Sequence, residues 1–313
     1  GDYPISGTVS WMPDSQSIVF SSNRRENVEY HPRQNDLYAA SIITGELTQM
    51  TDHAGPEGNP AVSTNGRYLA YTSATDTRQG YNRADLRVMD LTSGESRSLT
   101  ADLDRSVSDI QWSADSKSVW IRYNDLGMAR IAEVDLKGNL TRADVVLGGT
   151  ALGRPYTSGT FSVGGKDRIA YTLGRDDRPA DLALMRSGKQ PLQLTDLNSD
   201  LMGQREMSRV ERMVWPSSHD GLEIEGWVMK PPGFDPEKQY PMILEIHGGP
   251  HSAYGPNYST EAQLFAAAGY VVFYTNPRGS TSYGEKFANE IDLAYPGYDY
   301  DDLISGVDAL IDK

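Results

Sequence analysis

The residues best suited to chemistry are the two glycines of His247-Gly248-Gly249-Pro250. Glycine has no Cβ, so a ligand can approach its backbone N–H closely. Amide donors that meet a negatively charged oxygen as it develops during acyl transfer each lower the barrier by roughly 3–4 kcal/mol. The residue types and their spacing therefore predict Gly249, with Gly248 beside it, as a catalytic oxyanion donor.

Arg278, in the turn Asn276-Pro277-Arg278-Gly279, is a second candidate. It is expected either to bind a substrate carbonyl or carboxylate or to brace the two loops. His247 and His251 flank the glycines and are candidates for a general base. We favour the alternative that His247, at the end of a strand, orients the loop.

The remaining polar clusters have structural explanations. His31, His53 and His219 are isolated in polar segments and lack the spacing of metal ligands, so neither a metal nor a cofactor is expected. The acidic residues Asp299 and Asp302 fit the start of a helix from Tyr298 to Lys313. Asp299 is the expected N-cap, and Asp302 occupies the capping-box position.

The elements around the glycines alternate between strand and helix. Met242 to Ile246 is an apolar run typical of a strand buried on both faces. A helix is expected between an N-cap at Ser259 and a terminating Gly269, followed by a second buried strand from Tyr270 to Thr275. This order predicts a parallel α/β sheet, and a glycine loop in this place is half of the oxyanion hole of α/β-hydrolases.

The nucleophile that such a site needs is missing from this sequence. In α/β-hydrolases the serine lies in a G-x-S-x-G turn after a later strand, and the acid and histidine follow it. No such pattern occurs in the sequence, and the nearest segment, Gly279 to Gly284, has the wrong spacing. We therefore expect residues 199–313 to be the N-terminal part of a hydrolase domain, truncated before the nucleophile, and this chain to be inactive alone.

The first two thirds of the sequence repeat a pattern of four short strands. The repeat is marked by residues about 50 positions apart, namely Trp11, Val62, Trp112 and Phe161. The fourth strand of a repeat ends near a threonine, at Thr51, Thr100 and Thr195. Such units indicate β-propeller blades, because one blade cannot bury both faces and must stack on others. We predict four blades over residues 1–198, with the recurring aromatic residues in the core; a two-sheet sandwich is the alternative.

The composition limits the classes of function. A net charge of −14 argues against nucleic acid as a partner, and the absence of cysteine removes disulfides and thiolate catalysis. No apolar run approaches the ~18–20 residues of a membrane-spanning helix, so a membrane role is not expected. The compartment, cytoplasmic or periplasmic, and a homo-oligomeric state stay open.

These motifs resemble those of one family. The Trp-Ser-x-Asp pattern at Trp112 resembles TolB-like propellers. With His247 to His251, Asn276 to Ser280 and Tyr283-Gly284, the chain resembles the prolyl oligopeptidase family, in its acylaminoacyl-peptidase and dipeptidyl-peptidase branch. The resemblance implies a Ser-Asp-His triad on an α/β-hydrolase domain, a seven- or eight-bladed propeller, and hydrolysis of short peptides near their N-terminus. The chain would then be an internal fragment. A non-enzymatic TolB-like binding module and a carboxylesterase remain as alternatives.

Overall fold

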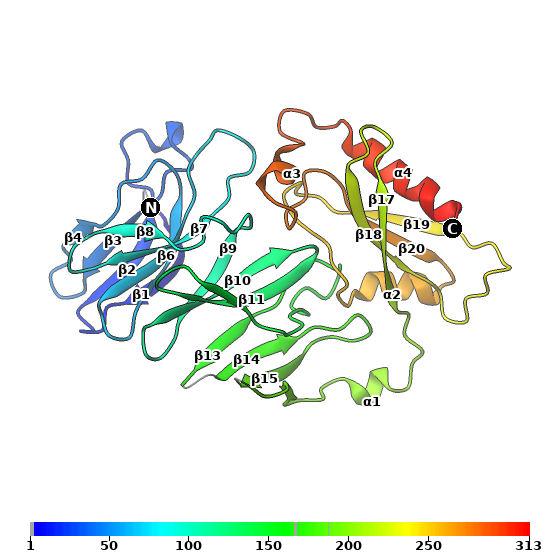
Figure 1. Ribbon diagram of the computed structural model, residues 1–313, viewed down its shortest axis with the longest axis horizontal. Helices are drawn as coiled ribbons and strands as arrows, with labels where there is room; N and C mark the ends of the chain where they lie inside the picture. Colours follow the sequence, from blue (N-terminus) through cyan, green and yellow to red (C-terminus); the bar gives the residue numbers. More distant parts are fainter. Residues whose placement is uncertain (1–2, 166–167, 187) are drawn as a thin grey trace. The chain divides into compact units, whose positions relative to one another are not determined.

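The computed structural model describes residues 3–165, 168–186 and 188–313, so Lys166 and Asp167 of the fourth repeat lie outside the described residues. Five open four-stranded sheets follow one another along the chain (Figure 1). The chain divides into two compact units. One comprises Gly1–Tyr123, Ile131–Asp144 and Ser162–Arg168, and the other comprises Asn124–Arg130, Val145–Phe161 and Ile169–Lys313. The boundary between residues 198 and 199 stays a prediction.

The first four sheets share one design, in which each strand lies beside the next one in the sequence. The first two are antiparallel throughout. They contain β1 (Ile5–Trp11), β2 (Ser17–Ser22), β3 (Asp36–Ser41) and β4 (Leu47–Gln49), then β5 (Glu57–Val62), β6 (Tyr68–Ser73), β7 (Asp85–Asp90) and β8 (Ser96–Ser98). The next two contain β9 (Val107–Trp112), β10 (Ser118–Asp125), β11 (Met128–Asp135) and β12 (Leu140–Arg142), then β13 (Phe161–Gly164), β14 (Arg168–Leu173), β15 (Asp181–Arg186) and β16 (Leu192–Gln193).

In three of these sheets the recurring threonine of the repeat adds one hydrogen bond next to the fourth strand. Its hydroxyl oxygen accepts a hydrogen bond from the N–H of the second residue of the third strand. The three bonds measure 2.8–2.9 Å and join Leu37 to Thr51, Leu86 to Thr100 and Leu182 to Thr195. A short polar side chain is needed there because the N–H lies just beyond the paired part of the fourth strand.

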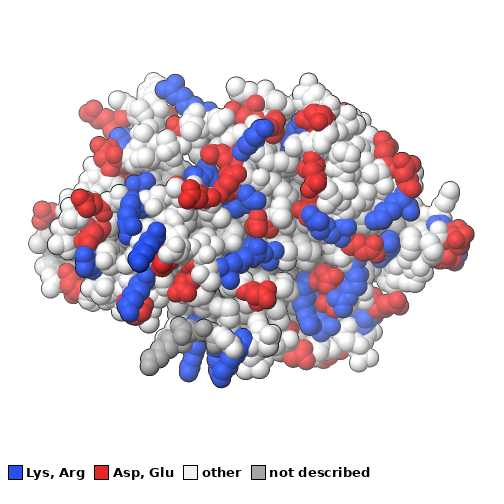
Figure 2. All heavy atoms as spheres, viewed as in Figure 1, with Lys and Arg blue, Asp and Glu red and all other residues white. Residues whose placement is uncertain are grey.

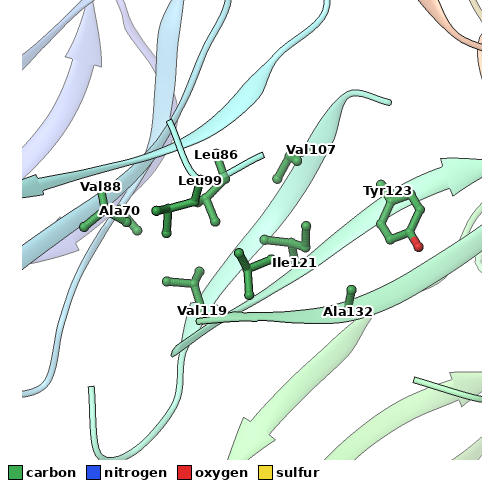
Figure 3. Packing of buried hydrophobic residues seen from close by; sticks show 10 residues of the cluster. Ala70, Leu86, Val88, Leu99, Val107, Val119, Ile121, Tyr123 and Ala132 are labelled. Atoms are coloured by element: carbon green, nitrogen blue, oxygen red, sulfur yellow. The ribbon is translucent and has the colours of Figure 1, made fainter. Parts of the chain in front are cut away.

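Aliphatic side chains of the second and third sheets pack together in the first compact unit. Figure 3 shows Leu86 and Val88 of the second sheet in one cluster with Val119 and Ile121 of the third; all are fully or almost fully buried. Because each sheet carries apolar residues on a face that it cannot bury alone, stacking against the next sheet removes that surface from water.

The recurring aromatic residues do not all occupy the core. Trp112 packs on Tyr68, with ring centroids 5.9 Å apart, and its Nε1–H donates to the Ala61 carbonyl at 2.8 Å. Phe161 is buried, but Trp11 is 58% exposed. The prediction of a core role was therefore wrong for Trp11. Trp112 packs against the preceding sheet, whereas the described residues contain no sheet before that of Trp11.

The fifth sheet is mixed and lies in the second compact unit. Its strands are β17 (Val210–Pro216), β18 (Glu223–Met229), β20 (Val271–Asn276) and β19 (Met242–Ile246), in that spatial order. β19 and β20 are parallel, and the other pairs are antiparallel. The helices are α1 (Ser199–Met202), α2 (Thr260–Ala267), α3 (Glu285–Asn289) and α4 (Asp299–Ile311).

The helices α2 and α4 cover opposite faces of the mixed sheet (Figure 1). Trp227 and Tyr274 face α2, while Phe273 faces α4, because successive strand residues point to opposite faces. The predicted N-cap is confirmed: Ser259 Oγ accepts the Ala262 N–H at 3.1 Å. In contrast, β19 is an edge strand of this sheet with partly exposed side chains, so the prediction that it is buried on both faces was wrong.

Candidate active site

The glycine loop follows β19 and leads to α2. Gly248 and Gly249 are both exposed. Within the described part of the chain, neither of their N–H groups donates a hydrogen bond. Gly249 has φ 144°, and a Cβ there would lie 3.0 Å from the His251 nitrogen. Only glycine fits this backbone without strain, and its N–H stays available to a ligand.

The His247 ring holds the peptide group that carries this N–H. His247 is buried, with Nδ1 3.1 Å from the Gly248 carbonyl oxygen and Nε2 3.0 Å from Ser280 Oγ. A carbonyl can only accept, so this contact places a hydrogen on Nδ1. The Ser280 hydroxyl that meets Nε2 also donates to the Pro277 carbonyl at 2.6 Å. Burial lowers the pKa of His247 below its usual 6.5, which favours the neutral ring.

The geometry of the peptide bond then aims the Gly249 N–H. The Gly248 carbonyl and the Gly249 N–H belong to one planar trans peptide, in which C=O and N–H point in opposite directions. When His247 holds the carbonyl oxygen, the N–H is directed away from the ring. His247 thus orients the loop, which is the role that the sequence favoured over general base.

The turn after β20 anchors the other half of the loop. Asn276 accepts the Tyr254 N–H at 2.8 Å and donates to the Tyr254 carbonyl at 2.9 Å. The Thr281 N–H donates to the Ser252 carbonyl at 2.9 Å, and His251 Nδ1 lies 3.1 Å from the Gly279 carbonyl oxygen. The two motifs that the sequence singled out, around residues 247–251 and 276–284, are therefore adjacent.

Arg278 contacts acidic side chains instead of facing the glycine loop. It is 3% exposed, and its guanidinium donates to Asp302 at 2.8 and 2.9 Å and to Asp220 at 3.0 and 3.1 Å. The hydrogen bond to Asp302, followed by that to Asp220, raises the pKa of Arg278 although burial opposes the shift. Arg278 does brace the turn after β20, but it ties that turn to α4 and to the β17–β18 turn and not, as the bracing alternative had expected, to the glycine loop.

The acidic start of α4 differs from the expected capping. The N-cap is Tyr298, which makes no side-chain cap bond, and Asp299 Oδ1 accepts the Gly297 N–H at 2.7 Å. Asp302 is fully buried and accepts from both the main chain and the side chain of Arg278. Its predicted capping-box role was wrong, because the buried guanidinium needs both of its oxygens.

His219 and His53 each contact an uncharged side chain. His219 stacks on Tyr298 with ring centroids 3.3 Å apart, and His53 Nε2 lies 3.3 Å from Thr75 Oγ1. In residues 3–165, 168–186 and 188–313, no group of three or more His, Cys, Asp or Glu residues is arranged to hold a metal ion. In the same residues, no helix has the length and apolar character to cross a membrane.

Sequence reasoning missed one segment near the site. Residues 152–157, between β12 and β13, pair with the loop before α2 and bring Tyr156 to His247, with ring centroids 6.4 Å apart. Arg154 binds Glu245 in β19 at 3.2 Å and Glu261 in α2 at 3.1 Å. No sequence pattern marks this pairing; the only local signal was the length of the connection between the strands.

The fold and the site define a general class of protein: repeated four-stranded sheets followed by an α/β layer with an exposed glycine loop after its parallel edge strand. Residues 256–313 match the prolyl oligopeptidase family. The chain is 30% identical to an uncharacterized peptidase, YuxL, of Bacillus subtilis, over 97% of this chain and 59% of that protein. It is 27% identical to dipeptidyl-peptidase 5 of Porphyromonas gingivalis, over 96% of this chain and 43% of that protein.

Solved structures show the same fold. The acylaminoacyl peptidase of Pyrococcus horikoshii superposes with a TM-score of 0.79 at 23% identity, over 99% of this chain and 45% of that one. The resemblance to the prolyl oligopeptidase family that the sequence motifs predicted is thus confirmed by the match of residues 256–313 to that family and by the similarity of nearly the whole chain to an uncharacterized peptidase. The chain spans about half the length of the curated relatives that it matches.

Proposed function

We propose that this chain is part of a serine peptidase that hydrolyses short peptides near their N-terminus through an acyl-enzyme. In this proposal Gly249, with Gly248 beside it, supplies one oxyanion donor. The four antiparallel sheets are propeller blades, and residues 199–313 are the first part of an α/β-hydrolase domain. The Ser-Asp-His triad lies outside residues 1–313, so the chain alone is inactive.

The exposed N–H of Gly249 is the observation that carries the proposal. It follows a parallel strand, it donates to no acceptor in the described part of the chain, and His247 fixes its peptide plane. An oxyanion donor must have this form, because a prearranged dipole stabilises developing charge without reorganising during the reaction. A pure binding propeller has no need of such a loop.

The surface charge does not define the substrate. Figure 2 shows Lys and Arg side chains interspersed with Asp and Glu over the face in view. A short peptide is proposed as substrate from the relatives whose names describe dipeptidyl and acylaminoacyl peptidases.

The test compares the whole gene product with the chain of residues 1–313. Both are assayed on N-acetyl-amino-acid anilides, dipeptide anilides and nitrophenyl esters, and a fluorophosphonate probe is used to label the nucleophilic serine. We expect anilide hydrolysis by the whole protein only, with the labelled peptide outside residues 1–313. Hydrolysis of esters alone would identify a carboxylesterase. If the whole protein turns over none of the substrates and is not labelled by the probe, the proposed peptidase function is wrong and the alternative of a binding module is favoured.

A further inference from the structure

The segment before β13 is joined to the candidate site by main-chain hydrogen bonds. The Thr157 N–H donates to the Ala253 carbonyl at 2.9 Å, and the Gly255 N–H donates to the Pro155 carbonyl at 2.8 Å. Tyr156 forms a β-bridge with Tyr254 between these two bonds. The segment therefore runs as a short added strand along the chain that leaves the glycine loop.

The bonding continues into the start of α2. The Thr260 N–H donates to the Leu152 carbonyl at 2.8 Å, and Ser259 Oγ donates to the Gly153 carbonyl at 2.9 Å. Asn257 Nδ2 donates to the Tyr156 carbonyl at 3.2 Å. The backbone on both sides of Tyr156 is thus held, so its side chain has a defined direction.

Aromatic contacts connect this held segment to His247. The Tyr156 ring is tilted against Tyr254, with centroids 4.7 Å apart, and lies 6.4 Å from the His247 ring. The Tyr254 ring meets His247 edge-on at 5.0 Å. Tyr156 is half-buried, whereas His247 and Tyr254 are buried. Of the two tyrosines packed on His247, Tyr156 is therefore the one nearer to solvent.

We propose that Tyr156 is a positioning residue for the Gly249 N–H, acting through the His247 ring. Tyr156 keeps water away from the ring and limits its rotation. The ring, in its Nδ1–H form, holds the Gly248 carbonyl. Because that carbonyl and the Gly249 N–H share one rigid peptide, fixing the ring fixes the donor. The catalytic meaning of this role rests on the proposed function, whereas the coupling from Tyr156 to His247 does not.

The groups around His247 support a neutral ring. Tyr156 and Tyr254 pack on it, and the Tyr254 hydroxyl donates to Glu245 at 3.1 Å. Arg154 lies 3.2 Å from Glu245 and balances its charge. On the remaining side, the ring meets the Ser280 hydroxyl, and His251 follows in the same loop. Burial thus dominates, and removing the Tyr156 ring should hydrate His247.

The first test is an NMR titration of the chain of residues 1–313. Histidine ring-nitrogen spectra are recorded for wild type, Tyr156→Phe and Tyr156→Ala, and the loss of one set of signals in His247→Asn assigns His247. We expect an Nδ1–H ring in wild type and in Tyr156→Phe, titrating below 6.5. In Tyr156→Ala the pKa should rise toward 6.5, and the preference for Nδ1–H should weaken.

An unchanged His247 titration in a folded Tyr156→Ala chain would overturn the proposal. If that variant fails to fold by circular dichroism, Tyr156→Gln, which removes the ring and its apolar surface but keeps a long side chain, decides in the same way. A raised pKa of His247 in the variant supports the proposal, and an unchanged pKa of His247 overturns it.

The second test measures turnover by the whole protein. Tyr156→Ala should lower kcat on the order of tenfold, less than the 10²–10³-fold loss typical of a removed oxyanion donor, and leave KM unchanged. Tyr156→Phe should match wild type. A raised KM with unchanged kcat would make Tyr156 a substrate-binding group and overturn the positioning role. If the wild-type protein hydrolyses no peptide, the proposed function fails, while the titration still decides the role of Tyr156.

Discussion

Arg278 Nη2 donates to Asp302 Oδ1 at 2.8 Å, and the side chains are 3% and 0% exposed. Asp302 also accepts the Arg278 N–H at 2.9 Å, so it holds both the charge and the main chain of the turn after β20. That turn anchors the glycine loop through Asn276. The buried pair therefore supports the turn to which the glycine loop is anchored.

Breaking this pair should be costly. Asp302→Asn leaves the Arg278 charge buried without its main partner, and we expect the free energy of unfolding to fall by about 3 kcal/mol or more. Urea denaturation measures the change. The matched control is Asp220→Asn, which removes a contact of the same guanidinium at 3.0 Å from a more exposed side chain and should cost much less. Equal losses in the two variants would contradict this account.

The two glycines of the loop should respond differently to alanine. A Cβ on Gly249 meets the His251 nitrogen at 3.0 Å at φ 144°, whereas a Cβ on Gly248 meets nothing within 4 Å. Gly249→Ala should cost about 1–3 kcal/mol of strain and lower the kcat of the whole protein. Gly248→Ala should leave stability nearly unchanged. Thermal denaturation and peptide turnover are measured for both variants. If Gly249→Ala is as stable and as active as wild type, glycine is not required at this position.

The N-cap of α2 should contribute measurably to stability. Ser259 is 1% exposed; its Oγ accepts the Ala262 N–H at 3.1 Å and donates to the Gly153 carbonyl at 2.9 Å. Ser259→Ala removes both bonds, and we expect a loss of about 1–2 kcal/mol in urea denaturation. Thr260→Ala, at the exposed next position, is the control and should change little. A similar loss in both variants would argue against a specific cap.

Glu57 should make the first compact unit less stable as pH rises. It is 3% exposed; burial raises its pKa above 4.5, while hydrogen bonds with Thr51 and Ser73 oppose the shift only in part. A folded-state pKa above the unfolded value gives stability that is complete below about pH 4.5 and is lost as pH rises through the folded-state pKa. Burial shifts the pKa of Asp36 in the same direction.

The Glu57→Gln variant tests this expectation, because glutamine cannot ionise. Unfolding free energies measured from about pH 4 to 8 should show wild type losing stability relative to Glu57→Gln as pH rises. The exposed Glu46→Gln substitution is the control and should keep the wild-type slope. Parallel curves for wild type and Glu57→Gln would show that the buried carboxyl does not control the pH dependence.

The sequence by itself determined the elements whose signals are local. The repeat length and its threonines predicted the first four sheets, and Ser259 predicted the start of α2. The glycine motif predicted the loop after β19, and the motifs together predicted the similarity to the prolyl oligopeptidase family. Each of these signals depends on residues close together in the chain, where backbone sterics, capping and side-chain period act directly.

Only the tertiary structure decided which distant residues meet. Asp302 has the sequence position of a capping residue, yet it pairs with Arg278 because a buried guanidinium must find an acceptor. Trp112 is packed and Trp11 is exposed, although they hold the same place in the repeat. Tyr156 reaches His247 because its backbone pairs with that of Tyr254, which is distant in the sequence. Such pairings depend on the free energy of burying whole surfaces together, which no single stretch of sequence encodes.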